Sequence, residues 1–407
     1  MCTAPKSTSM VASTCERAEP LPTTILMHPH LPRYALMLGN FVVGLAILLP
    51  AGMLHELSSG LDVSIAQAGL LVTFGAVVLC FGSPLVAWIT SRFDRRLLLG
   101  TTLAILALGH AASAFAPNYA ILLTLRLVML AVAAIYTPQA AGTVALIVPE
   151  KDRPSAIAFV FLGWSLAVAA GLPLVATVAA HLDWQATYGA IAAAAAIACV
   201  LLLLSLPHGL YGTPVSLRSW VAIFDNRLIL LLLLLTVLQA SSVFVLFIYF
   251  APLLSRLAHA DATTIAVLFA IYGVAGFVGN VIAQRIVMRL NPLRTAAVFM
   301  TSVLLGYGLW TFGSGILYVM GAGVIFWGLG FAAMNSMQQA RLVAAAPRLA
   351  TASVALNTSS IYIGQAIGSG VAGFLFAHDY PVAMGFAAIA FVVLGFFVLA
   401  MTRGHKA

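Results

Sequence analysis

Charged residues are scarce in this sequence: Asp, Glu, Lys and Arg make up 7% of its 407 residues, whereas 62% are hydrophobic. A soluble domain carries roughly a quarter of its residues as charges, so this chain has too few to cover itself with a water-soluble surface. Cysteines are also few. Cys2, Cys15, Cys80 and Cys199 show no spacing typical of a disulfide framework or a metal site, and we interpret them as free thiols.

The sequence also lacks the short motifs of common enzyme classes. It contains no GxxxxGK[ST] phosphate loop, no HExxH zinc motif and no GxSxG nucleophile elbow. Residues 1–33 contain no apolar core followed by a cleavage site, so they do not resemble a signal peptide. We therefore expect no enzyme activity, no metal and no bound cofactor.

What the sequence does contain is long apolar runs, with a mean hydropathy of +1.08. A bilayer crossing needs about 20 apolar residues. Runs of about this length recur at residues 34–54, 65–90, 97–115, 120–147, 156–180, 186–206, 228–252, 263–284, 295–312, 315–338, 351–376 and 382–401. The sequence predicts an all-α membrane protein with twelve transmembrane helices.

The basic residues lie in alternate loops. If the N-terminus is cytoplasmic, all but Arg126 and Arg256 of the nineteen Lys and Arg residues fall on the cytoplasmic side. This asymmetry is the positive-inside pattern of membrane proteins, and it explains the net charge of +8 without a nucleic-acid partner. We predict a multi-pass protein of the cell inner membrane, surrounded by lipid, with both termini in the cytoplasm.

The two halves of the chain resemble each other. A shift of 197 residues aligns Gly82 with Gly279, Arg92 with Arg289, Asp94 with Asn291 and Gly171 with Gly368. A repeat of six helices plus six is typical of two-lobed transporters. We expect a disordered cytoplasmic tail (1–33), an N-terminal lobe (34–206), a cytoplasmic linker with an interfacial helix (207–227), a C-terminal lobe (228–401) and a short cytoplasmic tail (402–407).

The segment GSPLVAWITSRFDRR (residues 82–96) resembles the Gly-x-x-x-Asp-Arg-x-Gly-Arg-Arg signature of the major facilitator superfamily. Arg126 matches the arginine of the family's second motif, and GWSLAVAAGLP (163–173) resembles its antiporter motif. Residues 346–373 are similar to the drug/proton antiporter branch, which includes arabinose-efflux and purine-ribonucleoside-efflux proteins. The resemblance implies two pseudo-symmetric six-helix lobes around a central cavity, and proton-coupled export.

The chain departs from the family pattern in two places. Ser91 stands where the loop signature has Asp, and Asp94 stands where it has Gly. The first span has Asn40 where many relatives carry an acid. Proton coupling therefore does not transfer directly from the resemblance.

Arg126 is the only charged residue inside a predicted span, and a charge in hydrocarbon costs at least about 2.5 kcal/mol. We predict a coupling or gating role, with Glu56 or Asp62 as its carboxylate partner; contacts to backbone carbonyls and snorkelling to the interface are the alternatives. His110 is a second coupling candidate, because histidine titrates in the physiological range. Its alternative is a hydrogen-bonded structural role.

Two further groups of residues are candidates. Arg92, Asp94, Arg95 and Arg96 either pin the cytoplasmic helix ends together as a gate or set the topology, with Asp94 capping the next helix. Gly163, Gly171 and Pro173 are predicted to let a neighbouring helix approach and to bend the fifth span.

Uncharged polar and aromatic residues within the spans are the candidates for substrate binding. They are Asn40, Tyr136, Gln139, Trp164, Gln239, Asn335 and Gln338. Hydrogen bonds or packing between helices are the alternative for each. We expect Asn280 and Asn357 to join helices in this way, and a place at the border of the cavity is the alternative for these two.

These features predict a monomeric secondary transporter that exports a small, weakly polar or amphiphilic molecule, such as a drug, nucleoside or sugar, with the proton as coupling ion. An uncoupled facilitator or uptake transporter is the first alternative, favoured by the missing carboxylate in the first span. A non-transporting membrane sensor or scaffold is the second.

Overall fold

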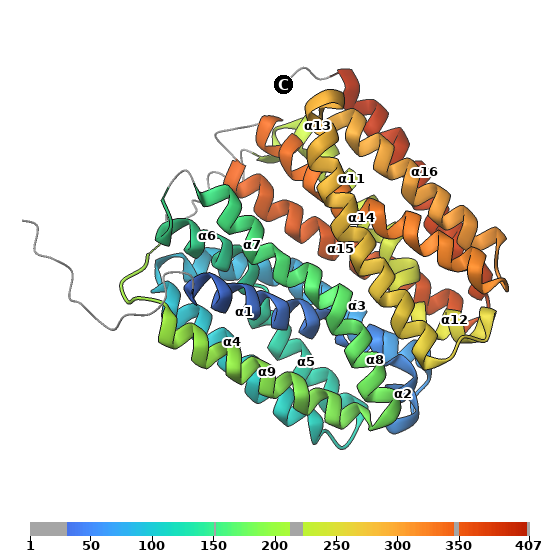
Figure 1. Cartoon of the computed structure of the whole chain (residues 1–407), viewed down its shortest axis with the longest axis horizontal. Helices are drawn as coiled ribbons and strands as arrows, with labels where there is room; N and C mark the ends of the chain where they lie inside the picture. The colour runs from blue at the N-terminus through green and yellow to red at the C-terminus, as the bar shows by residue number, and fades with distance from the viewer. Residues whose placement is uncertain (1–30, 150–151, 212–222, 346–349, 405–407) are drawn as a thin grey trace, which may run out of the picture.

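The computed structural model describes residues 31–149, 152–211, 223–345 and 350–404, most of which form helices (Figure 1). The N-terminal lobe contains α1 (Leu31–Leu48), η1 (Leu49–Gly52), α2 (Leu54–Gly60), α3 (Ile65–Ile89), η2 (Thr90–Arg92), α4 (Arg95–Ala114), α5 (Tyr119–Ala133), α6 (Tyr136–Ile147), α7 (Arg153–Leu166), the π-helical η4 (Ala167–Gly171), α8 (Leu172–His181) and α9 (Trp184–Ser205).

The C-terminal lobe contains α11 (Arg227–Phe247), α12 (Phe250–Ala258), α13 (Ala262–Phe312), α14 (Leu317–Ala345), α15 (Ala350–Ala377), α16 (Pro381–Met401) and η6 (Thr402–Gly404). No β-strand occurs in the ranges just given. The predicted tail 1–33 and the predicted interfacial helix of the linker fall mostly outside the described residues.

The helices account for twelve bilayer crossings. Among the described residues, eleven helical segments are long and apolar enough to cross a membrane. One of them, α13, has 51 residues, roughly twice the length that one crossing needs. Its backbone leaves the helical conformation at Asn291 (φ 65°, ψ 162°), directly before Pro292. α13 is therefore two successive spans joined by a sharp turn, and the predicted all-α membrane fold is confirmed.

Several spans are interrupted four residues before a proline. α5 and α6 are separated by a turn at Ala134, and Pro138 follows; α11 and α12 are separated by a turn at Ile248, and Pro252 follows. The π-helical η4 likewise precedes Pro173. Proline has no N–H with which to bond the carbonyl four residues earlier. The local sequence thus explains where these spans bend.

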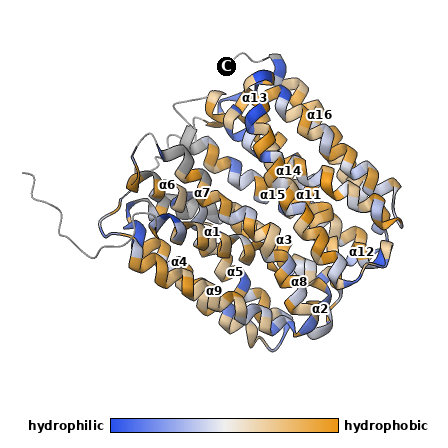
Figure 2. Ribbon diagram, in the orientation of Figure 1, coloured by the Kyte–Doolittle hydropathy of each residue, from blue (hydrophilic) through white to orange (hydrophobic). Residues whose placement is uncertain are grey.

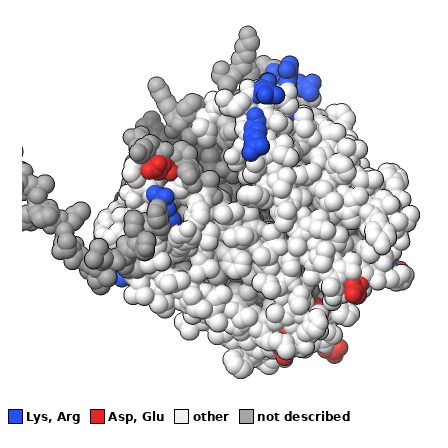
Figure 3. Space-filling model, in the orientation of Figure 1, with Lys and Arg blue, Asp and Glu red and all other residues white. Residues whose placement is uncertain are grey.

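Charge is concentrated at the two ends of the helices, and hydrophobic residues cover their length (Figure 2). One end, which we call the basic end, carries Arg92, Arg95, Arg96, Arg285, Arg289, Arg294, Arg341 and Arg403. The other, the opposite end, carries Asp62, Asp183, Asp261, Asp379 and Arg256. Figure 3 shows Lys and Arg mainly at the upper and left edges of the molecule and several acidic side chains at the lower right.

The two lobes repeat the same local structure at the turn between their second and third spans. Asp94 Oδ1 accepts a hydrogen bond from the Leu97 N–H at 3.0 Å and so caps α4. Asn291 Oδ1 accepts from the Arg294 N–H at 3.1 Å and caps the second half of α13. A side-chain oxygen at this position satisfies a free N–H in the first helical turn. The predicted repeat therefore has a structural counterpart at the aligned residues.

The lobes lie side by side and contact each other mainly through α3 with α15 and through α8 and η4 with α13 (Figure 1). Thr73 Oγ1 donates to Ser369 Oγ across the α3–α15 border at 2.9 Å. Gly273 lies so close to Ala169 that a Cβ on it would overlap the Ala169 backbone. These contacts lie in the half of the molecule near the opposite end, where the lobes close on each other.

Candidate functional site

The predicted binding residues of the N-terminal lobe are mostly bonded within that lobe. Asn40 is fully buried; its Nδ2 donates to the Val160 carbonyl at 3.0 Å and its Oδ1 accepts from Thr137 Oγ1 at 2.7 Å. Gln139 accepts a hydrogen bond from the Arg95 guanidinium. These residues join helices, which was the alternative to substrate contact.

The two aromatic candidates of this lobe pack against α1. Tyr136 is fully buried, with its hydroxyl 3.5 Å from the Leu36 carbonyl. The half-buried Trp164 lies against Gly44, where an added Cβ would come within 2.9 Å of the indole ring. Packing is therefore what the structure shows for both.

The candidates of the C-terminal lobe form a connected group. Thr236 Oγ1 of α11 donates to Asn357 Oδ1 of α15 at 2.8 Å, and Asn357 Nδ2 donates to Asn335 Oδ1 of α14 at 3.0 Å. We call Thr236, Asn357 and Asn335 the amide relay. Asn335 is half-buried, whereas Gln239 is buried with its Nε2 unpartnered.

Gln338, the last predicted binding residue, is fully buried near the basic end. Its Nε2 donates to the Leu232 carbonyl at 3.1 Å, and its Oε1 accepts from Arg341 Nη1 at 2.9 Å. Both ends of this amide are used inside the lobe. It is therefore a packing residue in this conformation.

Arg126 is buried, at 1% exposure, and donates to three backbone carbonyls. Its Nε bonds to Leu71 at 2.8 Å, Nη1 to Ala46 at 3.0 Å and Nη2 to Ile47 at 2.7 Å. In an uninterrupted helix the Ala46 carbonyl would accept from residue 50, which is Pro50 and has no N–H. Arg126 supplies the missing donor, and its charge also suits the negative end of the α1 dipole.

The predicted partner of Arg126 was wrong, whereas the carbonyl alternative describes the structure. Glu56 lies in α2 and Asp62 is exposed, and neither is paired with Arg126. Among the described residues the one ion pair joins Arg256 to Asp379, both in the C-terminal lobe. Arg126 also does not snorkel, because its side chain is fully enclosed.

His110 lies inside the N-terminal lobe at 1% exposure. Neither ring nitrogen has a hydrogen-bond partner in the described part of the chain. Its ring lies against Tyr188 of α9, with ring centres 5.7 Å apart. The hydrogen-bonded structural role is therefore not seen, and proton relay stays a prediction.

The loop between α3 and α4 is tied to the chain that leaves α9. Asp94 Oδ2 accepts from the N–H groups of Gly209 at 2.6 Å and Leu210 at 3.2 Å, and the Arg95 N–H donates to the Leu210 carbonyl at 2.8 Å. The Arg96 guanidinium contacts the His208 ring. We call these contacts the linker clasp. They stay within the N-terminal half, and Arg92 is exposed.

We expect Asp94→Ala to lower the melting temperature measured in detergent. It removes a helix cap, worth about 1 kcal/mol, and also the bonds to Gly209 and Leu210. Asp94→Asn should lower the melting temperature less than Asp94→Ala does, because its Oδ1 can still cap α4. It should still lower it, because the amide nitrogen cannot accept from Gly209 and Leu210. Equal melting temperatures for all three proteins would contradict the linker clasp.

The acid sensitivity of this clasp follows from the charge of Asp94. Partial burial raises the pKa of its carboxyl, but hydrogen bonds from the N–H groups of Leu97, Gly209 and Leu210 outweigh burial, so the pKa lies below its ordinary value. A lowered carboxyl pKa contributes stability above the unfolded-state pKa, near 3.9, and this is lost as pH falls through the folded-state value. The difference in melting temperature between Asp94→Ala and the unmodified protein should therefore be constant above about pH 5.

The fifth span packs tightly against the first through its glycines. A Cβ on Gly163 would overlap the Met37 carbonyl, and one on Gly171 would come within 2.9 Å of Leu45. In the C-terminal lobe, Gly364 and Gly368 lie equally close to the backbone of α11. Small residues at these positions allow the close approach of helices that membrane proteins use for packing.

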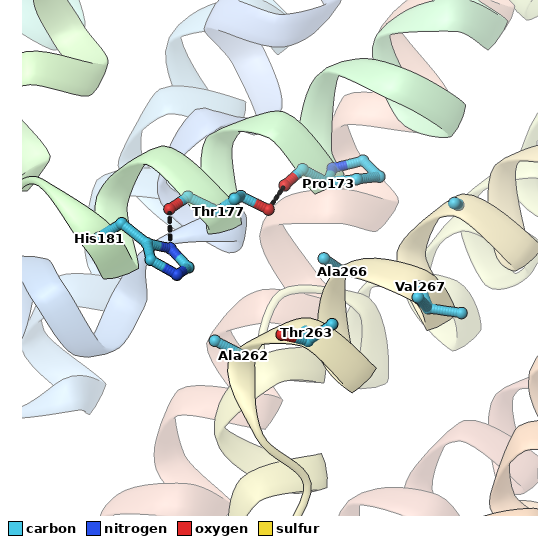
Figure 4. A pocket seen from close by; sticks show the side chains of 8 residues that line it. Pro173, Thr177, His181, Ala262, Thr263, Ala266 and Val267 are labelled. Atoms are coloured by element: carbon cyan, nitrogen blue, oxygen red, sulfur yellow. Dashed lines mark hydrogen bonds between the residues drawn. The ribbon is translucent and has the colours of Figure 1, made fainter.

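A crevice of about 260 Å³ lies between α8 and α13 near the opposite end (Figure 4). Two of its polar side chains are bonded to their own helix: Thr177 Oγ1 donates to the Pro173 carbonyl, and His181 Nδ1 lies 2.9 Å from the Thr177 carbonyl. The remaining lining is Thr263 together with alanine, valine and Pro173. Of the predicted site residues it contains only Pro173, so it is not the predicted binding site.

Sequence reasoning missed Tyr249, which lies at the break between α11 and α12. Its hydroxyl is 3.5 Å from the Ala66 carbonyl of the other lobe, and Gly69 leaves room for it. Its ring stacks on Phe376 at 5.0 Å. The only sequence signal was Pro252, which indicates the break but not the contact.

Comparisons with known proteins agree with this two-lobed architecture. The chain is 28% identical to the inner membrane transport protein YdhP of Escherichia coli over 84% of its length and 88% of the relative's. It is 25% identical to a probable sugar efflux transporter of Helicobacter pylori, over 88% of this chain and 90% of that one.

Solved structures share the fold at low sequence identity. A mutant of the nucleoside transporter NupG aligns with a TM-score of 0.77 at 13% identity, over 92% of this chain and all of that one. A D-xylose-proton symporter aligns with a TM-score of 0.73 at 14% identity, over 94% and 100%. The family model of the Major Facilitator Superfamily matches residues 36–369. With twelve spans in two lobes and most of its length matched by that model, the chain belongs to the major facilitator superfamily of transporters.

Proposed function

We propose that this transporter exports a small, uncharged or weakly polar molecule, with a sugar or nucleoside as the first candidates, in exchange for protons. It acts as a monomer in the cell inner membrane, with its basic end in the cytoplasm as the positive-inside pattern predicts. Relatives named as probable sugar efflux transporters support the export direction. The likeness to a nucleoside transporter concerns the fold alone.

The observation that supports the proposal is a set of contacts that join the lobes near the opposite end. Thr73–Ser369, Tyr249–Ala66 and Ala169–Gly273 join the lobes near the opposite end. Half-buried polar residues lie deeper between the helices, among them Asn335. With the basic end in the cytoplasm, closure near the opposite end is what an inward-facing state requires, and rocking of the lobes would then expose the site to the other side.

An uncoupled facilitator is the second candidate, and a specific observation favours it. Among the described residues no span contains Asp or Glu, and the buried Arg126 is bonded to carbonyls rather than to an acid. His110, whose ring nitrogens have no partner in the described part of the chain, is then the remaining candidate for carrying a proton. The coupling ion decides between the two candidates.

Flux measured in proteoliposomes tests both candidates. The proteoliposomes are supplied with a panel of radiolabelled sugars, nucleosides and drugs. We expect an imposed pH gradient to drive at least one of these compounds across the membrane against its concentration gradient. An unchanged flux with and without the gradient would reject proton exchange and leave the facilitator. No movement of any compound would favour the sensor or scaffold.

A further inference from the structure

The crevice between α8 and α13 has one wall from each lobe. In Figure 4, Thr177 and His181 lie on the side of α8, and Ala262 and Ala266 lie on the side of α13. The crevice has a volume of about 260 Å³. Because its two walls belong to different lobes, its width depends on how the lobes meet near the opposite end.

Large apolar side chains are exposed in and around this crevice. Val267, which lines it, is 52% exposed, and Leu174, beside the lining residue Pro173, is 61% exposed. Val274, two turns of α13 further on from Val267, is 55% exposed. Exposed apolar surface on the spans of a membrane protein contacts the hydrocarbon of the bilayer. A molecule that enters the crevice from the side is therefore a lipid.

The length of the crevice matches one leaflet of a bilayer. Its lining on α13 runs from Ala262 to Ala270. Just beyond Ala270 the two helices meet, because Gly273 lies so close to Ala169 that a Cβ on it would overlap the Ala169 backbone. Gly273 follows Ala262 by eleven residues, which is about 16 Å along a helix. The hydrocarbon core of a bilayer is about 30 Å thick, so one leaflet spans about half of that.

The walls of the crevice suit a hydrocarbon chain. Most of the lining consists of alanine, valine and proline, and the Thr177 hydroxyl is bonded to its own helix at the Pro173 carbonyl. An apolar cavity of about 150 Å³ stays free of water and binds small hydrocarbons. If the crevice were empty, its walls would lose dispersion contacts. A chain from the surrounding leaflet restores those contacts without leaving the hydrocarbon of the bilayer.

Carboxylates flank the mouth of the crevice on both lobes. Asp183 lies two residues beyond the end of α8, and Asp261 immediately precedes α13. Both are exposed, and each caps a helix through its Oδ1. The arginine of this end, Arg256, is paired with Asp379. This negative charge attracts a lipid head group that carries an ammonium and repels one with a net negative charge.

We propose that the crevice between α8 and α13 binds one acyl chain of a zwitterionic phospholipid from the leaflet at the opposite end, and that the ammonium of its head group lies beside Asp183 and Asp261. The bound chain contacts both lobes where they close on each other. Rocking that opens this end would separate α8 from α13 and dismantle the site. The lipid is distinct from the transported molecule, so its binding can be measured without knowing what is transported.

Photochemical labelling locates the lipid. Purified full-length protein in detergent is mixed with a small molar excess of phosphatidylcholine that carries a photoreactive diazirine in one acyl chain, and the labelled peptides are identified by mass spectrometry. We expect labels to concentrate in residues 173–181 and 262–270, which form the two walls of the crevice. Labels spread evenly over the lipid-facing sides of other spans, such as α9 and α16, would show non-specific contact and overturn the proposal.

Filling the crevice should exclude the lipid. Ala270 is half-buried and lines the crevice, so the ring in Ala270→Phe would occupy the space of the chain and remove the labels on both walls. Ala193→Phe is the matched control, because Ala193 is exposed on α9 at a similar distance from the opposite end. It should be labelled as the unmodified protein is. Melting temperatures show whether Ala270→Phe folds, and if it does not, the map of labels on the unmodified protein still decides.

Competition tests the choice of head group. Unlabelled phosphatidylcholine should reduce labelling of the crevice at several-fold lower concentration than phosphatidylglycerol with the same chains, and this difference should shrink in Asp183→Asn/Asp261→Asn, whose amide oxygens can still cap both helices. Equal competition by the two lipids would overturn the role of the carboxylates. Unchanged labelling of both walls in a folded Ala270→Phe protein would overturn the site itself, whatever the flux measurements show.

Discussion

Replacing Arg126 with alanine is expected to abolish transport while leaving membrane insertion intact. Insertion should not suffer, because the change removes a charge whose burial costs at least about 2.5 kcal/mol. The folded lobe should suffer, because the carbonyls of Ala46, Ile47 and Leu71 lose their donors, each at about 1–3 kcal/mol. Flux in proteoliposomes and the melting temperature in detergent measure the two effects.

A second substitution separates the two roles of Arg126, as hydrogen-bond donor to the carbonyls at the end of α1 and as a positive charge. Pro50→Ala supplies residue 50 with an N–H that can donate to the Ala46 carbonyl, so it should restore part of the stability lost in Arg126→Ala. If transport stays absent in the stabilised double variant, the guanidinium itself is needed. The exposed Arg289 at the basic end provides the control: Arg289→Ala should leave both flux and stability near their original values. Full transport by Arg126→Ala would refute the role assigned to this residue.

A disulfide between positions 73 and 369 is expected to stop transport reversibly. Thr73 Oγ1 and Ser369 Oγ are 2.9 Å apart across the two lobes, so paired cysteines at these positions are close enough to form a bond without large backbone movement. Once formed, the bond would hold the lobes closed near the opposite end and prevent them from rocking. Oxidation of Thr73→Cys/Ser369→Cys should abolish flux, and a reductant should restore it.

The experiment needs a background in which Cys2, Cys15, Cys80 and Cys199 are replaced, because all four are potential partners. A pair within one lobe is the control: Ser336 Oγ donates to Asn280 Oδ1 at 2.7 Å, both in the C-terminal lobe. Cysteines at positions 280 and 336 should cross-link without locking the lobes, so flux should persist. If the 73–369 disulfide forms and flux continues, closure near the opposite end does not alternate during transport.

Much of the architecture follows from sequence that is local to each helix. Apolar runs of bilayer length gave the spans, because only a helix satisfies its own backbone in lipid. Pro138, Pro173 and Pro252 stand four residues after interruptions, because each removes one helical hydrogen bond. Asp94 could be expected to cap α4, because the acceptor and the N–H that it bonds are three residues apart.

The candidate site was decided only in part by sequence. Composition identified the polar residues of the spans, including Asn40, Gln239 and Asn335, but not which of them bond to neighbouring helices. Asn40 contacts residues about a hundred positions away, and Thr73 contacts a residue 296 positions away. Which side chains meet depends on the rotation and depth of each packed helix, and hydropathy carries no information about either.

The sequence by itself therefore determined that the helices lie in lipid, how many spans there are and where they bend. Only the tertiary structure decided that Arg126 bonds to carbonyls rather than to Glu56 or Asp62, that Tyr249 reaches the other lobe, and that Gln239 Nε2 has no partner among the described residues. The physical reason is the separation in sequence of the groups that interact. Transfer into lipid and helix hydrogen bonds involve residues close together in the chain. The partners of buried polar groups are instead set by contacts between helices that lie far apart in the chain.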